Sequence, residues 1–362
     1  MRRPKILTLI FTLVILSAGL ALAQSDPSDP PDPTDRSDPL QYALKYRVDS
    51  RFMGDQLGVM AGEIEATGSY GQKLDFGLQV PLVTEMKARG RDMHFGNEYV
   101  ILKGKIGRPT VKLGQFVIPF GNLADYETHT KIFQSLYANS LGIRIDPGIE
   151  VDGYLGGAEY QVAITNGNGP FRSDLDGNKV VTARISKKLQ VGEDDLKVGI
   201  SALNGRLPVF SLLSDPLMDG KDAMLVNLNT AEAVGQNDRS GFADKTRYGA
   251  DVEYYRGIDL IRGEYVVGSD DGRRANGQWV QVEHPLNYKT SLIGMFERWQ
   301  QSTGSFTGWG IGIEHKVQDN RILRVAYQNR SIKEALRDPM TSDIMPMKMN
   351  MPVFTVQYLI EF

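Results

Sequence analysis

The sequence predicts an all-β fold, a transmembrane antiparallel β-barrel of about sixteen strands with short periplasmic turns and long extracellular loops. Three observations lead to this prediction. From residue 40 onward, apolar and polar residues alternate in segments of roughly ten residues, the length that a tilted strand needs to cross a bilayer. The links between these segments alternate in length. The sequence also closes on a strongly apolar segment.

The closing segment, PVFTVQYLIEF at 352–362, has a period of two. Phe354, Val356, Tyr358, Ile360 and Phe362 share one face, and smaller or polar residues fill most of the other. In a barrel this strand would close against the first one. We expect Tyr358 and Phe362 to anchor it at the lipid–water interface, where aromatic rings are favoured. Considered by itself, the segment also fits the last strand of a soluble sandwich.

The other expected strands show the same alternation, and helical periodicity is nearly absent. They include residues 42–48, 60–66, 74–82, 100–106, 111–113, 149–155, 160–164, 181–185, 196–200, 248–254, 261–267, 280–282, 288–299, 309–313 and 323–327. Their polar faces carry full charges in one strand after another, including Lys45, Arg47, Glu63, Lys103, Glu150, Arg184, Arg247, Glu264 and Arg324. Such a face fits either a water-filled lumen or the outside of a soluble sandwich.

The link lengths favour the membrane barrel. Short links are expected near 71–72, 107–109, 156–157, 192–195, 256–257, 285–287 and 318–320. Most of the intervening links are expected to be long, at 84–94, 119–147, 167–179, 206–245, 269–277 and 336–351. An even number of strands places both ends of the barrel on the short-turn side, which is periplasmic in outer-membrane barrels.

The first 39 residues have a different character. Basic residues precede an apolar run from Ile6 to Leu22, and Ala21-Leu22-Ala23 fits a cleavage site, so 1–23 is predicted to be a cleaved signal peptide. An uncleaved anchor helix is the alternative. Residues 24–39 repeat Asp-Pro and are expected to form a disordered tail, because proline disfavours both helix and strand. The barrel is predicted to occupy 40–362.

Composition excludes two classes of function. The formal net charge is −3, and removal of the basic leader would make it more negative, so the basic footprint of a nucleic-acid-binding protein is missing. The chain has no cysteine, which excludes disulfides and thiolate chemistry.

Three motifs indicate a family. The chain reads KLGQFVIPFG at Lys112–Gly121, IDPGIEVDG at Ile145–Gly153 and AEYQVAITNGNG at Ala158–Gly169. Over this region it resembles the phosphate-selective porin O/P group of Gram-negative outer-membrane porins. The resemblance implies a barrel of about sixteen strands, usually trimeric, whose third loop folds inward to narrow the pore. It would lie in outer-membrane lipid and lipopolysaccharide, and small solutes or ions would pass through it.

The link 119–147 falls where the resemblance places the inward loop, and an ordinary extracellular loop is the alternative. We predict that pore-lining and constriction residues come from this loop and from strands near it. These residues are Lys45, Arg47, Arg51, Lys103, Lys105, Lys112, Asp125, Glu127, His129, Lys131 and Arg144. Because this set contains both positively and negatively charged side chains, it does not by itself predict selectivity for phosphate. Basic and acidic side chains either form opposite walls of a constriction or balance one another locally as solvated charges.

No catalytic, metal or cofactor site is predicted. The four histidines lack metal-ligand spacing. Asp174, Asp176 and Asn178 resemble the start of a calcium loop, but Lys179 and Ile185 stand where glycine and glutamate are needed. Glu127 and His129 form a weak acid–base candidate, and a polar cluster lining the pore is preferred.

The sequence therefore predicts an outer-membrane porin, a passive water-filled channel for small hydrophilic solutes or ions, including phosphate or other anions. Two alternatives remain open, an outer-membrane enzyme built on a barrel and a plugged structural or adhesive barrel.

Overall fold

The computed structural model describes residues 40–53, 56–70, 74–83, 98–102, 109–124, 131–133, 136–169, 177–208, 242–302, 304–337 and 344–361. The predicted signal peptide and Asp/Pro-rich tail, 1–39, lie outside the described residues. Residues 40–362 form one compact unit. No helix in the described part of the chain is long and apolar enough to span a membrane.

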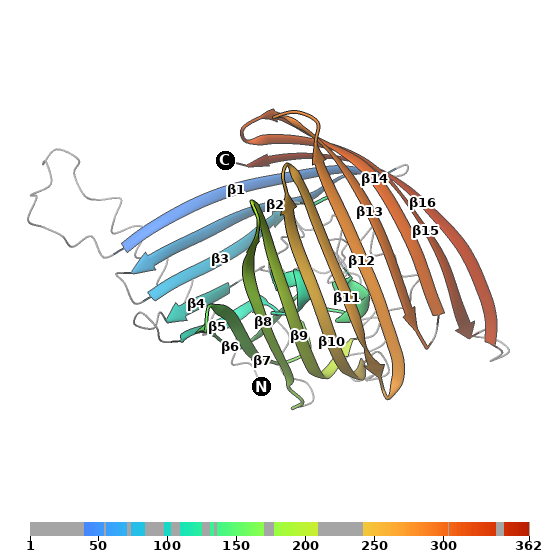
Figure 1. Cartoon of the computed structure of the whole chain (residues 1–362), viewed down its shortest axis with the longest axis horizontal. Helices are drawn as coiled ribbons and strands as arrows, with labels where there is room; N and C mark the ends of the chain where they lie inside the picture. The colour runs from blue at the N-terminus through green and yellow to red at the C-terminus, as the bar shows by residue number, and fades with distance from the viewer. Residues whose placement is uncertain are drawn as a thin grey trace, which may run out of the picture. The chain divides into compact units, whose positions relative to one another are not determined.

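The described residues form sixteen strands in one closed antiparallel barrel, in sequence order around the sheet (Figure 1). Their bounds are β1 Leu40–Met53, β2 Gln56–Tyr70, β3 Leu74–Val83, β4 Glu98–Leu102, β5 Thr110–Val117, β6 Ile145–Leu155, β7 Ala158–Thr165, β8 Val180–Val191, β9 Asp194–Pro208, β10 Phe242–Arg256, β11 Asp259–Asp270, β12 Arg273–Pro285, β13 Thr290–Gln301, β14 Gly304–Gln318, β15 Arg321–Arg337 and β16 Ile344–Glu361. The predicted fold class is confirmed.

Closure joins the first strand to the last. β1 pairs with β16 from Arg47 opposite Glu361 to Met53 opposite Thr355. Closing the sheet removes its two free edges, whose unpaired backbone groups would otherwise be exposed. The apolar closing segment found in the sequence is therefore the strand that completes the barrel.

Alternation along the strands separates two faces of the barrel. Side chains such as Phe354, Trp309 and Ile200 are exposed on the outer face. Arg184, Glu297 and Gln357 are buried on the inner face. Because directly opposed residues of neighbouring strands point to the same face, the register extends this division from strand to strand.

Two predicted long links are wrong. β11 and β12 are joined by a two-residue turn at Asp271 and Gly272, which both have positive φ, at 47° and 76°. An Asp-Gly pair with this geometry matches the twist of a tight hairpin. β15 and β16 remain paired as far as Arg337 opposite Ile344, so strand continues where 336–351 was expected to be loop. The described polar residues of that stretch, Arg337, Lys348 and Asn350, belong to these two strands.

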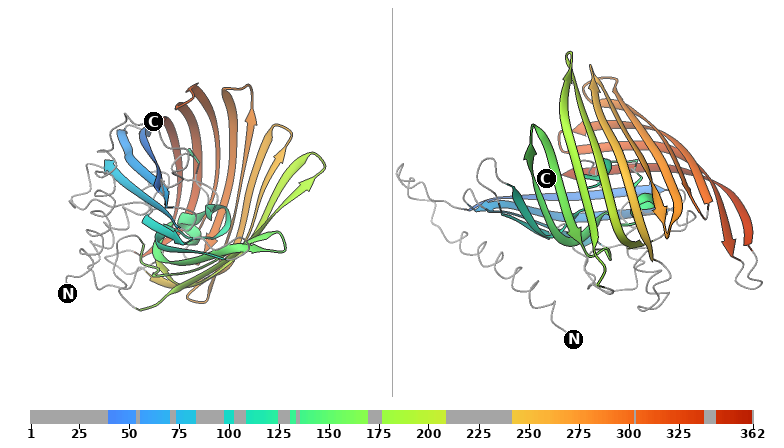
Figure 2. Two further views of the ribbon diagram at one scale, coloured as in Figure 1. Left: turned by 90° about the vertical axis from the view of Figure 1, so that its left-hand side faces the viewer. Right: turned by 60° about the horizontal axis from the view of Figure 1, so that its bottom comes forward.

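The link between β5 and β6 contains the 3₁₀ turn η1 Gly121–Ala124 and the short helix α2 Tyr137–Ser140. Figure 2, left, shows these helical turns within the curve of the sheet. We call the described residues 118–124, 131–133 and 136–144 the inner segment. Its apolar side chains form a buried cluster with residues from β8 to β15.

A pair of substitutions in β16 tests the assignment of faces. Val356→Arg would place a charge on the outer face and is expected to lower the free energy of unfolding in lipid vesicles by about 2–4 kcal/mol near the midplane. Thr355→Arg, on the inner face, should have a much smaller effect. Urea titration of the reconstituted protein measures both, and equal losses would contradict the alternation.

Candidate functional site

The turn η1 is held on the inner face of the barrel by three hydrogen bonds. The amide of Gly121 donates to Ser201 Oγ on β9 at 2.9 Å, and the amide of Asn122 donates to Glu264 Oε2 on β11 at 3.2 Å. Asn122 Nδ2 donates to the carbonyl of Gly263 at 2.7 Å. Gly121 has a φ of +55°, and a Cβ there would lie 2.7 Å from the carboxyl carbon of Glu264. Only glycine therefore permits this close approach.

Two basic residues of β10 hold the other end of the inner segment. Lys245 Nζ donates to the carbonyl of Leu141 at 3.0 Å, and Arg247 Nε donates to the carbonyl of Ser140 at 2.9 Å. Arg247 also pairs with Asp270 and stacks over Trp299 at 5.7 Å. Hydrogen bonds from charged donors are stronger than neutral ones, so α2 is firmly tied to this wall.

Aromatic side chains fill the space between these anchors. Phe120 lies over Gly249 on β10, where a Cβ would be 3.0 Å from its ring. Phe133 lies over Gly310 on β14, where a Cβ would be 2.6 Å from its ring. The two glycines therefore leave room for rings from the inner segment. Burial of these rings favours the inward position of the segment through the hydrophobic effect.

The inner face carries charges that are paired across strands. Arg184 on β8 and Asp251 on β10 lie 2.7 Å apart, and both are almost fully buried. Further pairs join Arg330 to Glu297 at 2.6 Å and Arg324 to Glu314 at 2.7 Å. Pairing offsets the cost of removing each charge from water.

A second group of charges connects the inner segment to β12. Arg262 on β11 pairs with Glu253 at 2.8 Å and with Glu283 at 2.7 Å. Lys131 approaches Glu283 at 3.6 Å. These side chains retain between about a tenth and a quarter of their exposure, so they can interact with a solute in the lumen.

Lys112 on β5 lies on a different part of the wall. Its ammonium group is 2.7 Å from Glu150 Oε1 on β6 and within 6 Å of the Tyr99 and Phe116 rings. The lysine is one-fifth exposed, whereas Glu150 is buried. It therefore presents a partly neutralised positive charge beside an aromatic surface.

The structure divides the predicted site residues into three groups. Lys112, Lys131 and Arg144 are described on or beside the inner segment and its neighbouring strands, and Arg144 is buried with its carbonyl accepting the amide of Ile118 at 2.9 Å. Lys45 is exposed and faces Glu65 in register.

For a second group, only the backbone is described. Arg47 and Arg51 are paired in register with Glu361 and Gln357. The third group lies outside the described residues: Lys103, Lys105, Asp125, Glu127, His129 and the predicted anchor Phe362. Tyr358 is described on β16 and is partly exposed.

Sequence reasoning missed the residues that hold the inner segment. Arg247 and Glu264 were recognised as charges on a polar face, and Ser201 and Lys245 were not singled out. Their inward phase on long strands was readable from the alternation. Which of many inward charges meets a loop far away in sequence depends on the closed sheet.

In the described ranges, no group of three or more histidine, aspartate or glutamate side chains is arranged to hold a metal ion. The apparent calcium-loop residues Asp174 and Asp176 lie outside the described ranges, and the structure gives no test of them.

Comparison with known proteins places the fold. OmpT of Vibrio cholerae, an outer membrane protein in trimer form, has 14% identity, covers 90% of this chain and 100% of its own, and has a TM-score of 0.60. The anion-selective porin from Comamonas acidovorans has 12% identity, covers 89% of this chain and 100% of its own, and has a TM-score of 0.59. OprB of Pseudomonas putida has 11% identity, covers 89% of this chain and 94% of its own, and has a TM-score of 0.58.

The chain thus has the fold of the outer-membrane porins. No protein-family model matches it, and no curated protein matches it. At these identities, the structural likeness establishes the barrel and leaves solute and selectivity open.

A glycine substitution tests the seating of the inner segment. Gly310→Leu would place a side chain where Phe133 lies and should detach the segment from β14. Because the chain has no cysteine, a single Ser140→Cys is a clean reporter of the buried segment. Maleimide should label this thiol faster in the Gly310→Leu background.

Gly294→Leu is the matched control, since a Cβ there has nothing within 4 Å. Its labelling rate should match that of the parent. Equal labelling in Gly310→Leu and the parent would show that Phe133 does not hold the segment.

Proposed function

We propose that this protein is an outer-membrane porin, a passive water-filled channel for small hydrophilic solutes or ions. The observation that carries the proposal is the combination of an apolar outer face with a charged inner face in one closed barrel. An apolar exterior suits lipid, and paired charges suit a lumen that contains water.

The position of the inner segment suggests which path solutes take through the barrel. Its described contacts are with β9, β10, β11, β12 and β14. The proposed path runs along the remaining wall, where Lys45, Lys112 and the backbone positions of Arg47 and Arg51 lie. The inner segment would then form one side of a constriction, as the resemblance to the O/P group implies.

Mixed charge on this path argues for weak selectivity. Lys112 is paired with Glu150, and Lys131 with Glu283, so each lysine is largely balanced where it stands. Phosphate or another anion remains the proposed class of solute on the basis of the O/P-like motifs. A partly exposed lysine beside aromatic rings would attract anions without excluding cations.

The proposal also implies how the protein is exported, where it resides and how it assembles. The leader 1–23 would direct export and be removed, and the barrel would reside in the outer membrane of a Gram-negative bacterium as a homotrimer. Lipid and lipopolysaccharide would surround it. No cofactor or energy source is required for passive diffusion.

Planar-bilayer recording tests the proposal directly. The reconstituted protein should show stable ohmic conductance without added substrate. A bilayer that shows no conductance after the protein is inserted would favour the plugged structural or adhesive barrel. Protease or lipase activity of the purified protein, lost on substitution of a lumenal or rim side chain, would favour the enzyme.

Charge in the lumen should set ion preference. Lys112→Gln combined with Lys131→Gln is expected to shift the reversal potential in a salt gradient towards cations, most clearly at low salt, where screening is weak. Lys187→Gln with Lys289→Gln removes the same charge from exposed residues on β8 and the β12–β13 turn and should cause no shift. An unchanged potential in the first variant would place both lysines away from the narrow part of the path.

Topology provides an independent test. Residues 209–241 link β9 to β10 at the end opposite the β6–β7 and β8–β9 turns, so an epitope tag near Asp219 should be accessible on intact cells. A tag in the short β6–β7 turn at Gly156 should become accessible only after rupture of the outer membrane. The reverse pattern would invert the proposed orientation.

A further inference from the structure

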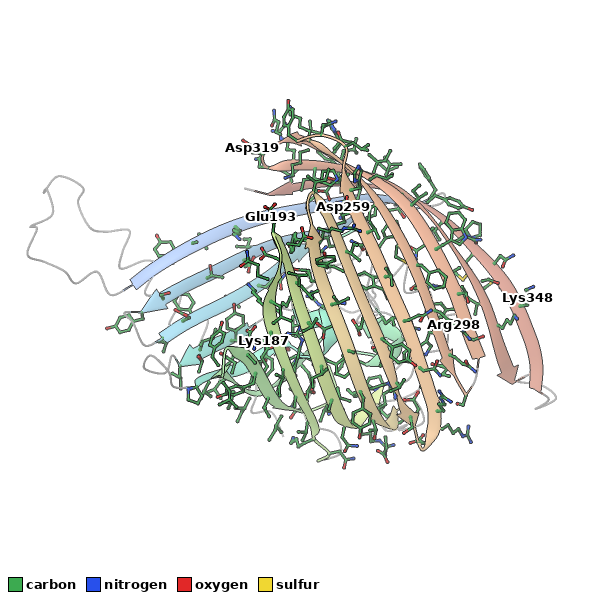
Figure 3. The ribbon with its side chains drawn as sticks, viewed as in Figure 1. Lys187, Glu193, Asp259, Arg298, Asp319 and Lys348 are labelled. Atoms are coloured by element: carbon green, nitrogen blue, oxygen red, sulfur yellow. The ribbon has the colours of Figure 1, made fainter. Side chains whose placement is uncertain are left out.

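The end of β16 away from the β14–β15 turn carries a row of methionines. Met345, Met347, Met349 and Met351 occupy every second position, so four of the chain's 13 methionines fall within seven residues. The label of Lys348 in Figure 3 marks this part of the strand. Because alternate residues of a strand belong to one face, the four positions share a phase. We call them the methionine row.

The phase of the methionine row is that of the inner face. In the register of β15 with β16, Met349 lies opposite Ile332 and Met351 lies opposite Arg330. Ile332 is 1% exposed, and Met351 packs against the buried apolar cluster that contains Ile332. The side chains of Met349 and Met351 are themselves partly exposed. They therefore combine contact with an apolar wall and access from the inside of the barrel.

The chemistry of this row differs from that of the inner face beside it. There the strands carry charged pairs such as Arg330 with Glu297 and Arg324 with Glu314. The methionine row offers thioether sulfur instead, in a chain without cysteine. Thioether sulfur is a soft, polarisable ligand, which suits Cu(I) and similar cations, whereas Mg²⁺ and Ca²⁺ prefer oxygen. The ligand type of the row is therefore that of a soft-metal site.

The spacing of the row allows neighbouring sulfur atoms to share one ion. Successive positions on one face of a strand are roughly 7 Å apart along the chain. Methionine is unbranched and has three rotatable side-chain bonds, so thioethers at this spacing can reach a common point. In the described pairing, β1 reaches β16 only as far as Thr355, which leaves β15 as the neighbour of the row.

The nearest basic group on the inner face is already neutralised. Arg330, opposite Met351, donates to Glu297 Oε1 from two of its nitrogens, at 2.6 and 2.9 Å. Its guanidinium also lies over the Phe306 ring, 4.3 Å from the ring centroid. Because this charge is paired, it would oppose a cation at the row only weakly.

The other charged residues next to the row also permit a cation. The register places Glu334 directly opposite Met347, which brings an acidic residue to the same part of the strand pair. Lys333 and Lys348 are exposed and belong to the opposite phase of β15 and β16. Their repulsion of an ion on the inner face is weakened by water and salt.

We propose that the methionine row binds a soft monovalent metal ion of the Cu(I) and Ag(I) class through the thioethers of Met347, Met349 and Met351. The binding step is coordination alone and changes no oxidation state. The inference goes beyond the proposed function, because a conducting barrel and a plugged barrel would both present this row.

Equilibrium dialysis of the untagged full-length protein against Ag(I), in neutral detergent without chloride, tests the proposal. The parent should bind a single Ag(I) ion per chain. The variant Met347→Leu, Met349→Leu, Met351→Leu keeps the volume and apolar character of the row and removes its sulfur. It should bind Ag(I) at least about tenfold more weakly, since the loss of even an outer-shell partner of a metal costs that much.

The matched control Met60→Leu, Met218→Leu, Met224→Leu removes three thioethers from elsewhere in the sequence and should bind Ag(I) like the parent. Thermal unfolding followed by circular dichroism verifies that all three proteins are folded. Equal binding by the parent and the row variant would overturn the proposal and leave the methionines a packing role alone. Equal losses in the row variant and the control would indicate unspecific uptake by methionine and would also overturn it.

Nuclear magnetic resonance of the parent labelled with methyl-¹³C methionine gives a test that needs no multiple variant. One equivalent of Ag(I) should shift the methyl signals of Met349 and Met351, assigned by single Met→Leu substitutions, and leave most others in place. Shifts confined to other methionines would contradict the proposal. Displacement of Ag(I) by equimolar Zn²⁺ would indicate an oxygen or nitrogen site and would contradict it as well.

Conductance separates this inference from the proposed function. A parent that binds Ag(I) but does not conduct would contradict the channel and leave the metal site standing. A parent that conducts and binds Ag(I) no better than the row variant would do the opposite.

Discussion

The structure depends on the closure of one sheet. The pairing of β1 with β16 leaves every strand with two neighbours, so backbone groups are satisfied within the barrel rather than by water. Once the sheet is closed, each strand must place alternate side chains in two different environments. A period of two along the sequence thus becomes an apolar outside and a charged inside.

The charged inside is stabilised by pairing between strands. Arg184 with Asp251 and Arg330 with Glu297 are buried, and removing either partner would leave an uncompensated charge. Lys245 and Arg247 donate hydrogen bonds to carbonyl groups of the inner segment, and Arg247 also pairs with Asp270. For Arg247, the inner segment supplies an acceptor in addition to Asp270 and the carbonyl of Ser269 on β11. Its position and the burial of these bases are therefore mutually dependent.

Charge is treated differently on the two faces of β13 to β16. Inside, arginines meet glutamates within hydrogen-bond distance. Outside, Arg298, Lys333 and Lys348 are exposed, and Lys333 lies directly opposite Lys348 across β15 and β16. Electrostatic interactions within the barrel explain the pairing of the inner charges. Along each of these strands, alternate side chains thus face the inside and the outside of the barrel.

Alternation of residue type determined much of the architecture on its own. The inward phase of Arg184, Glu264 and Arg324, the closing role of 352–362 and the tight turn at Gly156-Gly157 were all readable, because they depend on neighbours in sequence. The tight Asp271-Gly272 turn was missed because surrounding polar residues suggested a longer loop. Only the tertiary structure decided which charges meet. Glu264 is 142 residues from Asn122, and Arg247 is 107 residues from Ser140, and contacts over such separations depend on strand register, tilt and closure, which no local pattern contains.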